Sequence, residues 1–285
     1  MEKSKALPIP KTIKLFINGE FPRTESGRSF QVMHHGTKKT FANLCQASRK
    51  DLRTAVTAAQ EALPAWEKRT SYNRSQILYR MAEMLEAKRV EVASLLAQTC
   101  GLTKKMQNQA VDLAIESLVY FCGFCDKYQQ VIGSVNPVSG PHHCFTTAEP
   151  VGVVGLIATE DVDFAGFWAS LAAILASGNT VIALLPTNLA ALTGLLGEVL
   201  ATADLPKGTV NLLSGFREEL LSHFASHMEI HSLSYQGYDN AEMTQIRKLA
   251  AANMKRTVGP VRDILSLEHL IQYLEFKTVW HPIGN

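Results

Sequence analysis

Short apolar runs alternate with amphipathic segments in the second half of the chain. Residues 151–157 are nearly all apolar, which is typical of a strand buried on both faces. The later apolar runs cover 180–184, 209–213 and 230–235, and the helical patterns cover 164–176, 189–203, 218–225 and 241–253. This alternation predicts an α/β fold with a doubly wound parallel sheet and right-handed crossovers. Such sheets bind ligands beyond the carboxyl ends of their strands.

The first half of the chain is dominated by helical spacing of apolar residues. Leu15 to Phe21 alternates instead, and its Asn18-Gly19 pair favours a tight hairpin turn. The predicted helices cover 52–63, 72–99 and 107–131, and Gly101 ends the second of them. Residues 132–149 are rich in Gly, Pro, Ser and His, and we expect them to form an extended crossing segment.

Composition and charge exclude only a few classes of partner and location. A net charge of +2, with Lys and Arg scattered along the chain, favours neither nucleic acid nor an acidic membrane surface as a partner. Polar and glycine residues interrupt the most apolar stretch, 164–185, so we expect no membrane insertion. No apolar segment follows the basic first eleven residues as a signal peptide would require. The five cysteines lack framework spacing, which favours a reduced, cytoplasmic protein.

Four motifs in order resemble the aldehyde dehydrogenase superfamily. They are Glu149-Pro-Val-Gly-Val-Val-Gly155, Ala176-Ser-Gly-Asn-Thr180, Leu205-Pro-Lys-Gly-Thr-Val-Asn211 and Asn253-Met-Lys-Arg256. Upstream, the segments starting at Leu15 and Asp51 look like the family's opening hairpin and first helix. Each motif is moderately specific, and together at family spacing they cover most of the chain. Within the superfamily, the chain most resembles the degenerate second unit of the two-unit family-16 enzymes.

The resemblance implies how the chain is organised. We expect a Rossmann-like dinucleotide domain with an N-terminal helical layer and a C-terminal oligomerisation strand. The boundaries expected are 1–131 for the hairpin and helical part, 132–149 for the crossing segment, 150–259 for the Rossmann-like core and 260–285 for the tail strand. The family's catalytic domain, which would stand between the core and the tail, has no counterpart.

The residues at the family's catalytic places differ from those that the reaction needs. Asp161 stands where the family has an Asn that donates a hydrogen bond to the oxyanion, and an ionised carboxylate only accepts. Pro260 stands where the family has its general-base Glu, and proline cannot take a proton. All five cysteines precede residue 150, so none matches the nucleophile. Asp161 and Asp163 could form a new acid/base pair, but solvated loop carboxylates are the favoured interpretation.

The cofactor site that the resemblance implies is also altered. Leu184 replaces the Lys that holds the adenosine ribose, and Arg217 and Leu221 replace two glycines of the phosphate loop. The remaining candidates for cofactor contact are Ile157, Ala158, Thr187, Gly215, Tyr235 and Gly237. We therefore expect NAD(P) to bind weakly or not at all, and we expect no metal site.

Two pairs of residues have spacing that metal sites also use. Cys122 and Cys125 lie in an apolar helical pattern without a second pair, which favours buried structural thiols. His223 and His227 are one helical turn apart, but no third ligand is evident, and a surface helix is the favoured interpretation.

Residues 267–280 resemble the family's C-terminal tail, whose strand joins the sheet of a neighbouring subunit. Without a catalytic domain, we expect this strand to find its edge in a full-length aldehyde dehydrogenase homologue or another protein. Three functions remain open. The chain is a catalytically inactive module that acts through assembly or regulation, a residual NAD(P)-dependent oxidoreductase acting on aldehydes, or a truncated product without activity. Whether it is an enzyme stays open, although the missing Cys and Glu point away from catalysis.

Overall fold

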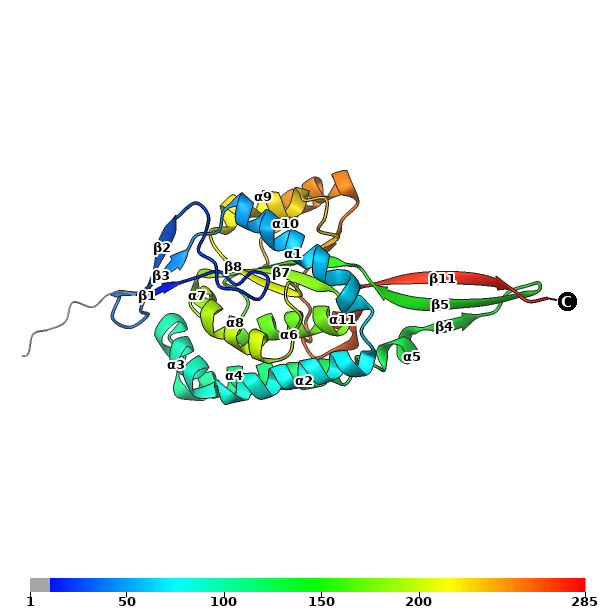
Figure 1. The fold of residues 1–285 in the computed structure, drawn as a ribbon, viewed down its shortest axis with the longest axis horizontal. Helices are drawn as coiled ribbons and strands as arrows, with labels where there is room; N and C mark the ends of the chain where they lie inside the picture. Colours follow the sequence, from blue (N-terminus) through cyan, green and yellow to red (C-terminus); the bar gives the residue numbers. More distant parts are fainter. Residues whose placement is uncertain (1–10, 285) are drawn as a thin grey trace, which may run out of the picture.

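The computed structural model describes residues 11–284, so the expectation about a signal peptide lies largely outside the described residues. A five-stranded parallel sheet runs through the body of the molecule in the order β10-β9-β6-β7-β8 (Figure 1). Its strands are β6 (Val153–Ala158), β7 (Thr180–Leu185), β8 (Val210–Ser214), β9 (Ser232–Gln236) and β10 (Arg256–Val258). The prediction of a doubly wound α/β fold is confirmed. In the described part of the chain, no helix combines the length and the apolar composition that crossing a bilayer requires.

Helices cover both faces of this sheet, so the residues of β6, β7 and β8 are buried on both sides (Figure 1). One layer contains α1 (Arg49–Glu67), α9 (Arg217–Ser226) and α10 (Asn240–Ala250). The other contains α2 (Ser71–Ala87), α3 (Arg89–Cys100), α4 (Lys104–Cys122), α6 (Phe164–Ala176), α7 (Thr187–Ala190) and α8 (Thr193–Thr202). Side chains of β7 alternate between the two cores, with Val181 packed in one and Ile182 in the other.

Three of the predicted helices are interrupted in the structure. The segment 72–99 divides at Lys88, where the backbone leaves the helical region (φ −97°, ψ 6°) and α3 starts in a new direction. The segment 107–131 divides into α4 and the short α5 (Tyr128–Ile132), and 189–203 divides into α7 and α8. Continuous helices were therefore the wrong interpretation, because apolar spacing continues across a bend when both pieces pack on one core. Gly101 ends α3 with φ 71°, as predicted.

The opening turn is tight, as Asn18-Gly19 predicts. Both residues have positive φ, and Ile17 and Glu20 exchange two backbone hydrogen bonds of 3.0 Å. Phe16 then pairs with Leu212 of β8, which attaches the turn to the parallel sheet. The sequence patterns gave no prediction for the small sheet of β1 (Lys11–Ile13), β2 (Ser29–Met33) and β3 (Thr40–Cys45).

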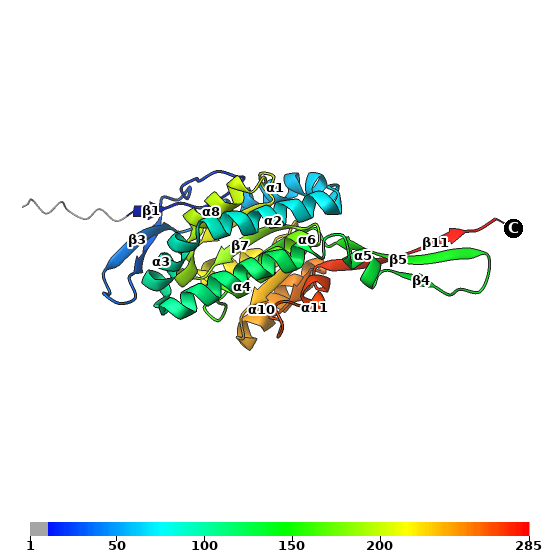
Figure 2. The same ribbon diagram turned by 90° about the horizontal axis from the view of Figure 1, so that it is seen from below.

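A three-stranded antiparallel sheet, which we call the arm, extends from the body (Figures 1 and 2). It consists of β4 (Ser134–Asn136), β5 (His142–Pro150) and β11 (Leu274–Pro282), in the order β11-β5-β4. The strand β11 follows the short helix α11 (Leu267–Ile271) and pairs with β5 along its whole length. The tail strand thus pairs within its own chain, mostly along the extended segment 132–149, and the sequence patterns did not predict this pairing.

Candidate functional site

Three of the six candidate cofactor residues meet at the carboxyl edge of the sheet. Ala158 ends β6, Thr187 begins α7, and Gly215 follows β8, and all three line one small cavity of about 90 Å³. Leu184 and Arg217, which replace family residues, line the same cavity. The structure thus places the predicted residues at the edge where doubly wound sheets bind ligands.

The other three candidates are buried in the body and do not line this cavity. Gly237 packs so closely on its neighbours that a Cβ atom there would lie 2.6 Å from the Tyr235 hydroxyl. The Tyr235 hydroxyl donates a hydrogen bond to the Glu242 carboxylate. Burial and this bond raise the pKa of Tyr235. For Ile157, Tyr235 and Gly237, packing within the chain explains the position without a cofactor.

Arg217 bridges two carboxylates at the mouth of the cavity. Its Nε lies 3.0 Å from both oxygens of Glu242, and a terminal nitrogen lies 2.9 Å from Glu160. Glu160 belongs to the turn after β6, and Glu242 belongs to the first turn of α10. In this arrangement two carboxylates balance the charge of the guanidinium.

Sequence reasoning found Arg217 but missed both of its partners. The usable signal was their place in the order of elements. Glu160 and Glu242 each follow a parallel strand within a few residues, and the carboxyl ends of such strands share one edge.

The turn after β6 carries the carboxylate at the family's oxyanion place. Asp161 is exposed and accepts hydrogen bonds from the Thr159 hydroxyl at 3.2 Å and from the backbone N–H of Tyr238 at 3.4 Å. Asp163 caps α6 by accepting from the N–H of Gly166 at 2.7 Å. The two carboxylates have separate structural partners, which agrees with loop carboxylates and not with an acid/base pair. Pro260 is half-buried beyond the end of β10.

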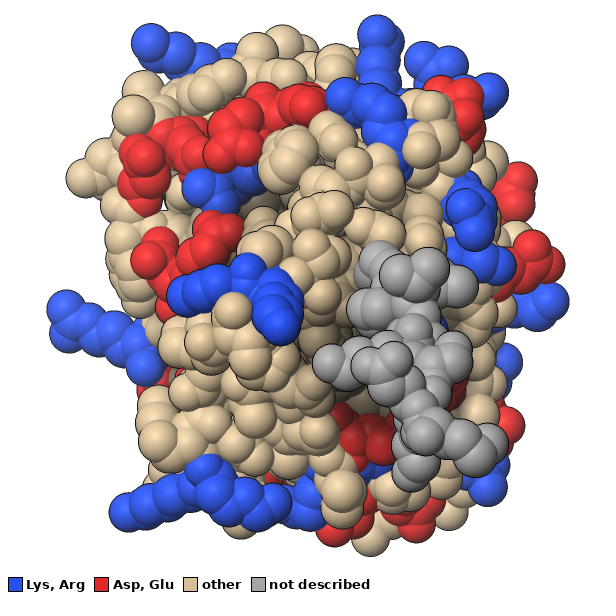
Figure 3. Space-filling view, turned by 90° about the vertical axis from the view of Figure 1, so that its left-hand side faces the viewer, with Lys and Arg blue, Asp and Glu red and all other residues tan. Residues whose placement is uncertain are grey.

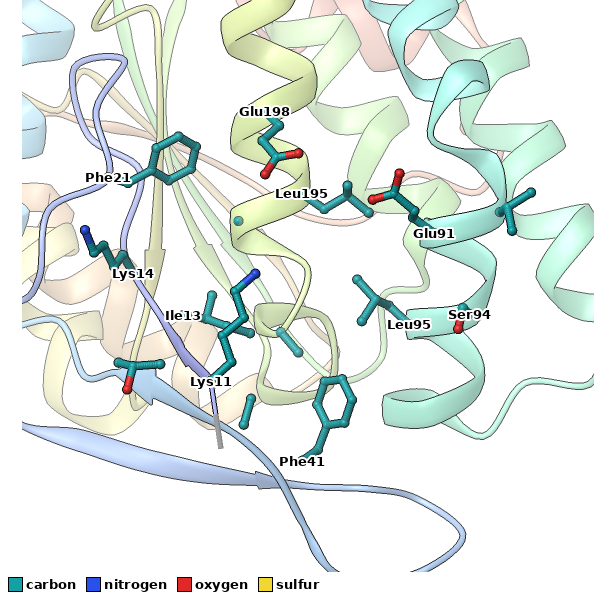
Figure 4. A pocket seen from close by; sticks show the side chains of 15 residues that line it. Lys11, Ile13, Lys14, Phe21, Phe41, Glu91, Ser94, Leu95, Leu195 and Glu198 are labelled. Atoms are coloured by element: carbon teal, nitrogen blue, oxygen red, sulfur yellow. The ribbon is translucent and has the colours of Figure 1, made fainter. Parts of the chain in front are cut away.

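The space at the carboxyl edge is small for a dinucleotide. Pockets for drug-sized ligands are commonly about 300–1,000 Å³, several times the volume available here. A groove of about 790 Å³ lies instead between the N-terminal strands, α3 and α8 (Figure 4), and it shares no lining residue with the cavity of Arg217. On this end of the molecule, acidic and basic side chains are interspersed (Figure 3).

One thiol of the cysteine pair is buried and the other is half-buried. Cys125 is fully buried, and burial raises its pKa to about 12. Cys122 is half-buried, and its thiol donates to the carbonyl oxygen of Ser75 at 3.3 Å. Within residues 11–284, no three His, Cys, Asp or Glu side chains gather as a metal site would need.

The model of the aldehyde dehydrogenase family matches residues 21–259. The chain belongs to this family. The putative aldehyde dehydrogenase DhaS of Bacillus subtilis is 32% identical over 249 residues, which are 86% of this chain and 49% of that protein. Human retinaldehyde dehydrogenase 3 is 31% identical over 89% of this chain and 51% of its own length.

Solved structures of the family superpose on the same part of the chain. The NAD+ complex of aldehyde dehydrogenase from Bacillus cereus has a TM-score of 0.80 at 27% identity, covering 87% of this chain and 50% of that one. PnpE from Pseudomonas sp. WBC-3 has a TM-score of 0.81 at 25% identity, with the same shares covered. The chain thus spans about half the length of the relatives it matches. The Rossmann-like assignment of the sheet agrees with these superpositions.

Family motifs have clear structural roles at the amino end of the sheet. The buried Asn179 side chain accepts from the N–H of Gly152 at 2.7 Å and donates to the carbonyl oxygen of Tyr273 at 2.9 Å. Gly152 has φ 117°, and a Cβ there would lie 2.3 Å from Nδ1 of His231. In the third motif, Asn211 donates to the carbonyl oxygen of Gly208 at 2.8 Å. The motifs that show the family therefore stabilise the scaffold.

Proposed function

We propose that this chain is a non-catalytic aldehyde-dehydrogenase-like module that acts by assembling with another protein through its arm. The exposure of β11 carries this proposal. Residues 275–282 are all exposed, and among them Phe276, Val279 and Trp280 are 49%, 42% and 59% exposed. In the sheet order, β11 is an edge strand. An exposed edge with large apolar side chains is suited to strand addition.

The carboxyl edge of the sheet supports the non-catalytic half of the proposal. Asp161 and Pro260 cannot perform the roles of the family's oxyanion donor and general base. Arg217 and its two carboxylate partners occupy the approach to the small cavity. We infer that NAD(P) binds weakly or not at all.

The partner that fits best is a full-length aldehyde dehydrogenase homologue. Such a protein would offer a sheet edge of the kind that the family's tail strand pairs with. Pairing along β11 would satisfy the outer backbone groups of that strand and bury its apolar side chains.

Co-purification tests this proposal. The chain is mixed with a full-length aldehyde dehydrogenase, and its elution is followed by size-exclusion chromatography with light scattering. We expect a complex that Phe276→Glu with Trp280→Glu abolishes, because two charges would be buried in the interface. Val135→Glu on β4, a residue 70% exposed on the opposite edge of the arm, is the matched control. A monodisperse monomer in both the presence and the absence of the homologue would contradict the assembly role.

Point variants are better suited to this test than deletion of the tail. Leu270, Tyr273 and Leu274 are at most 1% exposed and belong to the main core. Deleting residues 267–285 would uncover that core, so the deletion would confuse loss of assembly with loss of folding.

A further inference from the structure

A second cavity lies on the face of the sheet that α1 and α9 cover. Its volume is about 260 Å³, and it shares no lining residue with the cavity at Arg217 or with the arm. The residues that line it are Arg49, Leu52, Arg53, His223, Ser226, His227 and Met228. The two histidines that the sequence singled out therefore face two arginines of another helix.

The charges around this cavity are mostly positive. Arg49 and Arg53 lie one turn apart on α1, and within residues 11–284 neither guanidinium forms an ion pair or a side-chain hydrogen bond. Behind the cavity, the buried Lys255 donates to the carbonyl oxygens of His227 at 2.7 Å and Phe224 at 3.2 Å. Backbone carbonyls leave the charge of Lys255 unneutralised.

His227 adds a hydrogen-bond donor. The backbone N–H of Glu229 donates to its Nδ1 at 3.3 Å, so the proton of the neutral ring lies on Nε2. Burial, together with Lys255 and the two arginines of α1, lowers the pKa of His227. The carboxylate of Glu229 acts in the opposite direction and raises the pKa of His227. This carboxylate also accepts a hydrogen bond from the side chain of Gln60. The neutral ring therefore has its donor on Nε2, and it lines the cavity together with two arginines.

We propose that this cavity binds the phosphate group of a small phosphate monoester. Arginine forks match phosphate oxygens in a bidentate way, and Arg49 and Arg53 have no competing carboxylate among the described residues. The volume suits a phosphate with a few further atoms, since larger ligands need about 300 Å³ or more. The cavity is open to solvent, where Arg49, Arg53 and Met228 are exposed, and Leu52 and Met228 are the apolar residues beside it that can contact the carbon atoms of the ester.

Histidine NMR tests the proposal on the intact chain. The ring C–H signals of His223 and His227, assigned through His223→Gln and His227→Gln, are followed during titration with inorganic phosphate and, separately, glycerol 3-phosphate. Sodium chloride keeps the ionic strength constant, because surface electrostatics respond to salt. We expect saturable shifts and a rise in the pKa of His227, since a bound dianion favours the imidazolium. Tighter binding of the ester than of phosphate would assign the site to the ester.

Two double variants that each remove two positive charges distinguish a specific phosphate site from general electrostatic attraction of anions. Arg49→Gln with Arg53→Gln should weaken binding at least tenfold, which is about the effect of one lost charge-assisted hydrogen bond. Arg247→Gln with Lys248→Gln on α10 removes the same charge from an exposed place and should change affinity less than twofold. Far-UV circular dichroism confirms that each variant is folded. The proposal is overturned by shifts that do not saturate, or by equal losses in the two variants.

Discussion

The amino and carboxyl ends of β6 differ in the side-chain contacts that surround them. At the amino end, Asn179 connects Gly152 with the carbonyl oxygen of Tyr273, so a single amide joins the start of the sheet to the tail. At the carboxyl end, Arg217 connects Glu160 with Glu242. The first set of contacts uses Gly152 and Asn179 of the family motifs, and the second is centred on Arg217, which replaces a glycine of the family's phosphate loop.

The difference indicates that this chain keeps the residues that the backbone of the fold requires. Gly152, Asn179 and Gly208 answer requirements of the backbone, such as a positive φ or a carbonyl that needs a donor. A family enzyme needs the carboxyl end open to a cofactor. Here Arg217 and Glu160 at the same place form ion pairs within the chain.

The largest effect is expected for Asn179→Ala at the amino end. The substitution leaves the N–H of Gly152 and the carbonyl oxygen of Tyr273 buried without this partner. Each unsatisfied group costs about 1–3 kcal/mol, so the free energy of unfolding should fall by roughly 3 kcal/mol or more. Urea denaturation measures it, with Asn240→Ala at an exposed place as control. A loss equal to that of the control would remove the contrast between the two ends.

A smaller loss is expected for Arg217→Ala at the carboxyl end. The Arg217 and Glu242 side chains are 23% and 19% exposed, so their pair is only partly screened by solvent. We expect the free energy of unfolding to fall by about 1–2 kcal/mol, because Glu242 keeps Tyr235 as a donor. The same urea experiment checks this value. A loss larger than that of Asn179→Ala would reverse the order.

Lys255, just before β10, should make the free energy of unfolding depend on pH. Burial lowers its pKa from 10.5 to about 8, so the folded chain releases this proton at lower pH than the unfolded chain does. Between these two values the unfolded state binds more protons, and stability should therefore rise with pH, by about 1 kcal/mol after allowance for solvent. Below about 8 both states are protonated and the contribution is constant. Unfolding of the parent and Lys255→Met at pH 8 and 10 tests this, because the variant should lack the rise.

The smallest effect is expected for activity. If the proposed function is right, the chain should give no aldehyde-dependent reduction of NAD or NADP, because Pro260 at the place of the family's base cannot take a proton. Arg217→Gly should raise NAD affinity less than tenfold, because Leu184 still offers no bond to the ribose. Absorbance at the reduced nicotinamide band and calorimetry are the measurements. A rate lost on denaturation of the protein, or micromolar affinity in the parent chain, would support the oxidoreductase alternative.

The core strands were predictable because each is a compact apolar run. The predicted helix 164–176 matches α6 in full, and β6 to β9 lie within two residues of their predicted bounds. The short β10 escaped because Arg256-Thr-Val258 has no apolar run, and its register comes from pairing with β9. Local patterns cannot report such a tertiary requirement.

For the candidate site, the sequence predicted which positions belong to it but not which side chains contact one another. The resemblance located Asp161, Arg217 and Pro260, whose side chains differ from those of the family. The pairing of Arg217 with Glu160 joins positions 57 apart, and that with Glu242 joins positions 25 apart, so sequence spacing gives no direct sign of either bond. The pairing of β11 with β5 was not predictable for the same reason, because the two strands are far apart in the sequence.

The pairing of β11 with β5 has a consequence for the order of folding. Thr146 and Thr278 share a hydrogen bond although they are 132 positions apart, so this sheet closes a long loop. During synthesis, β5 emerges well before β11, and one of its edges stays unpaired until residues 274–282 leave the ribosome. A nascent chain halted before residue 274 can form the parallel sheet but not the completed arm. Completion of the arm is thus a late step in the synthesis of this chain, since it waits for residues 274–282.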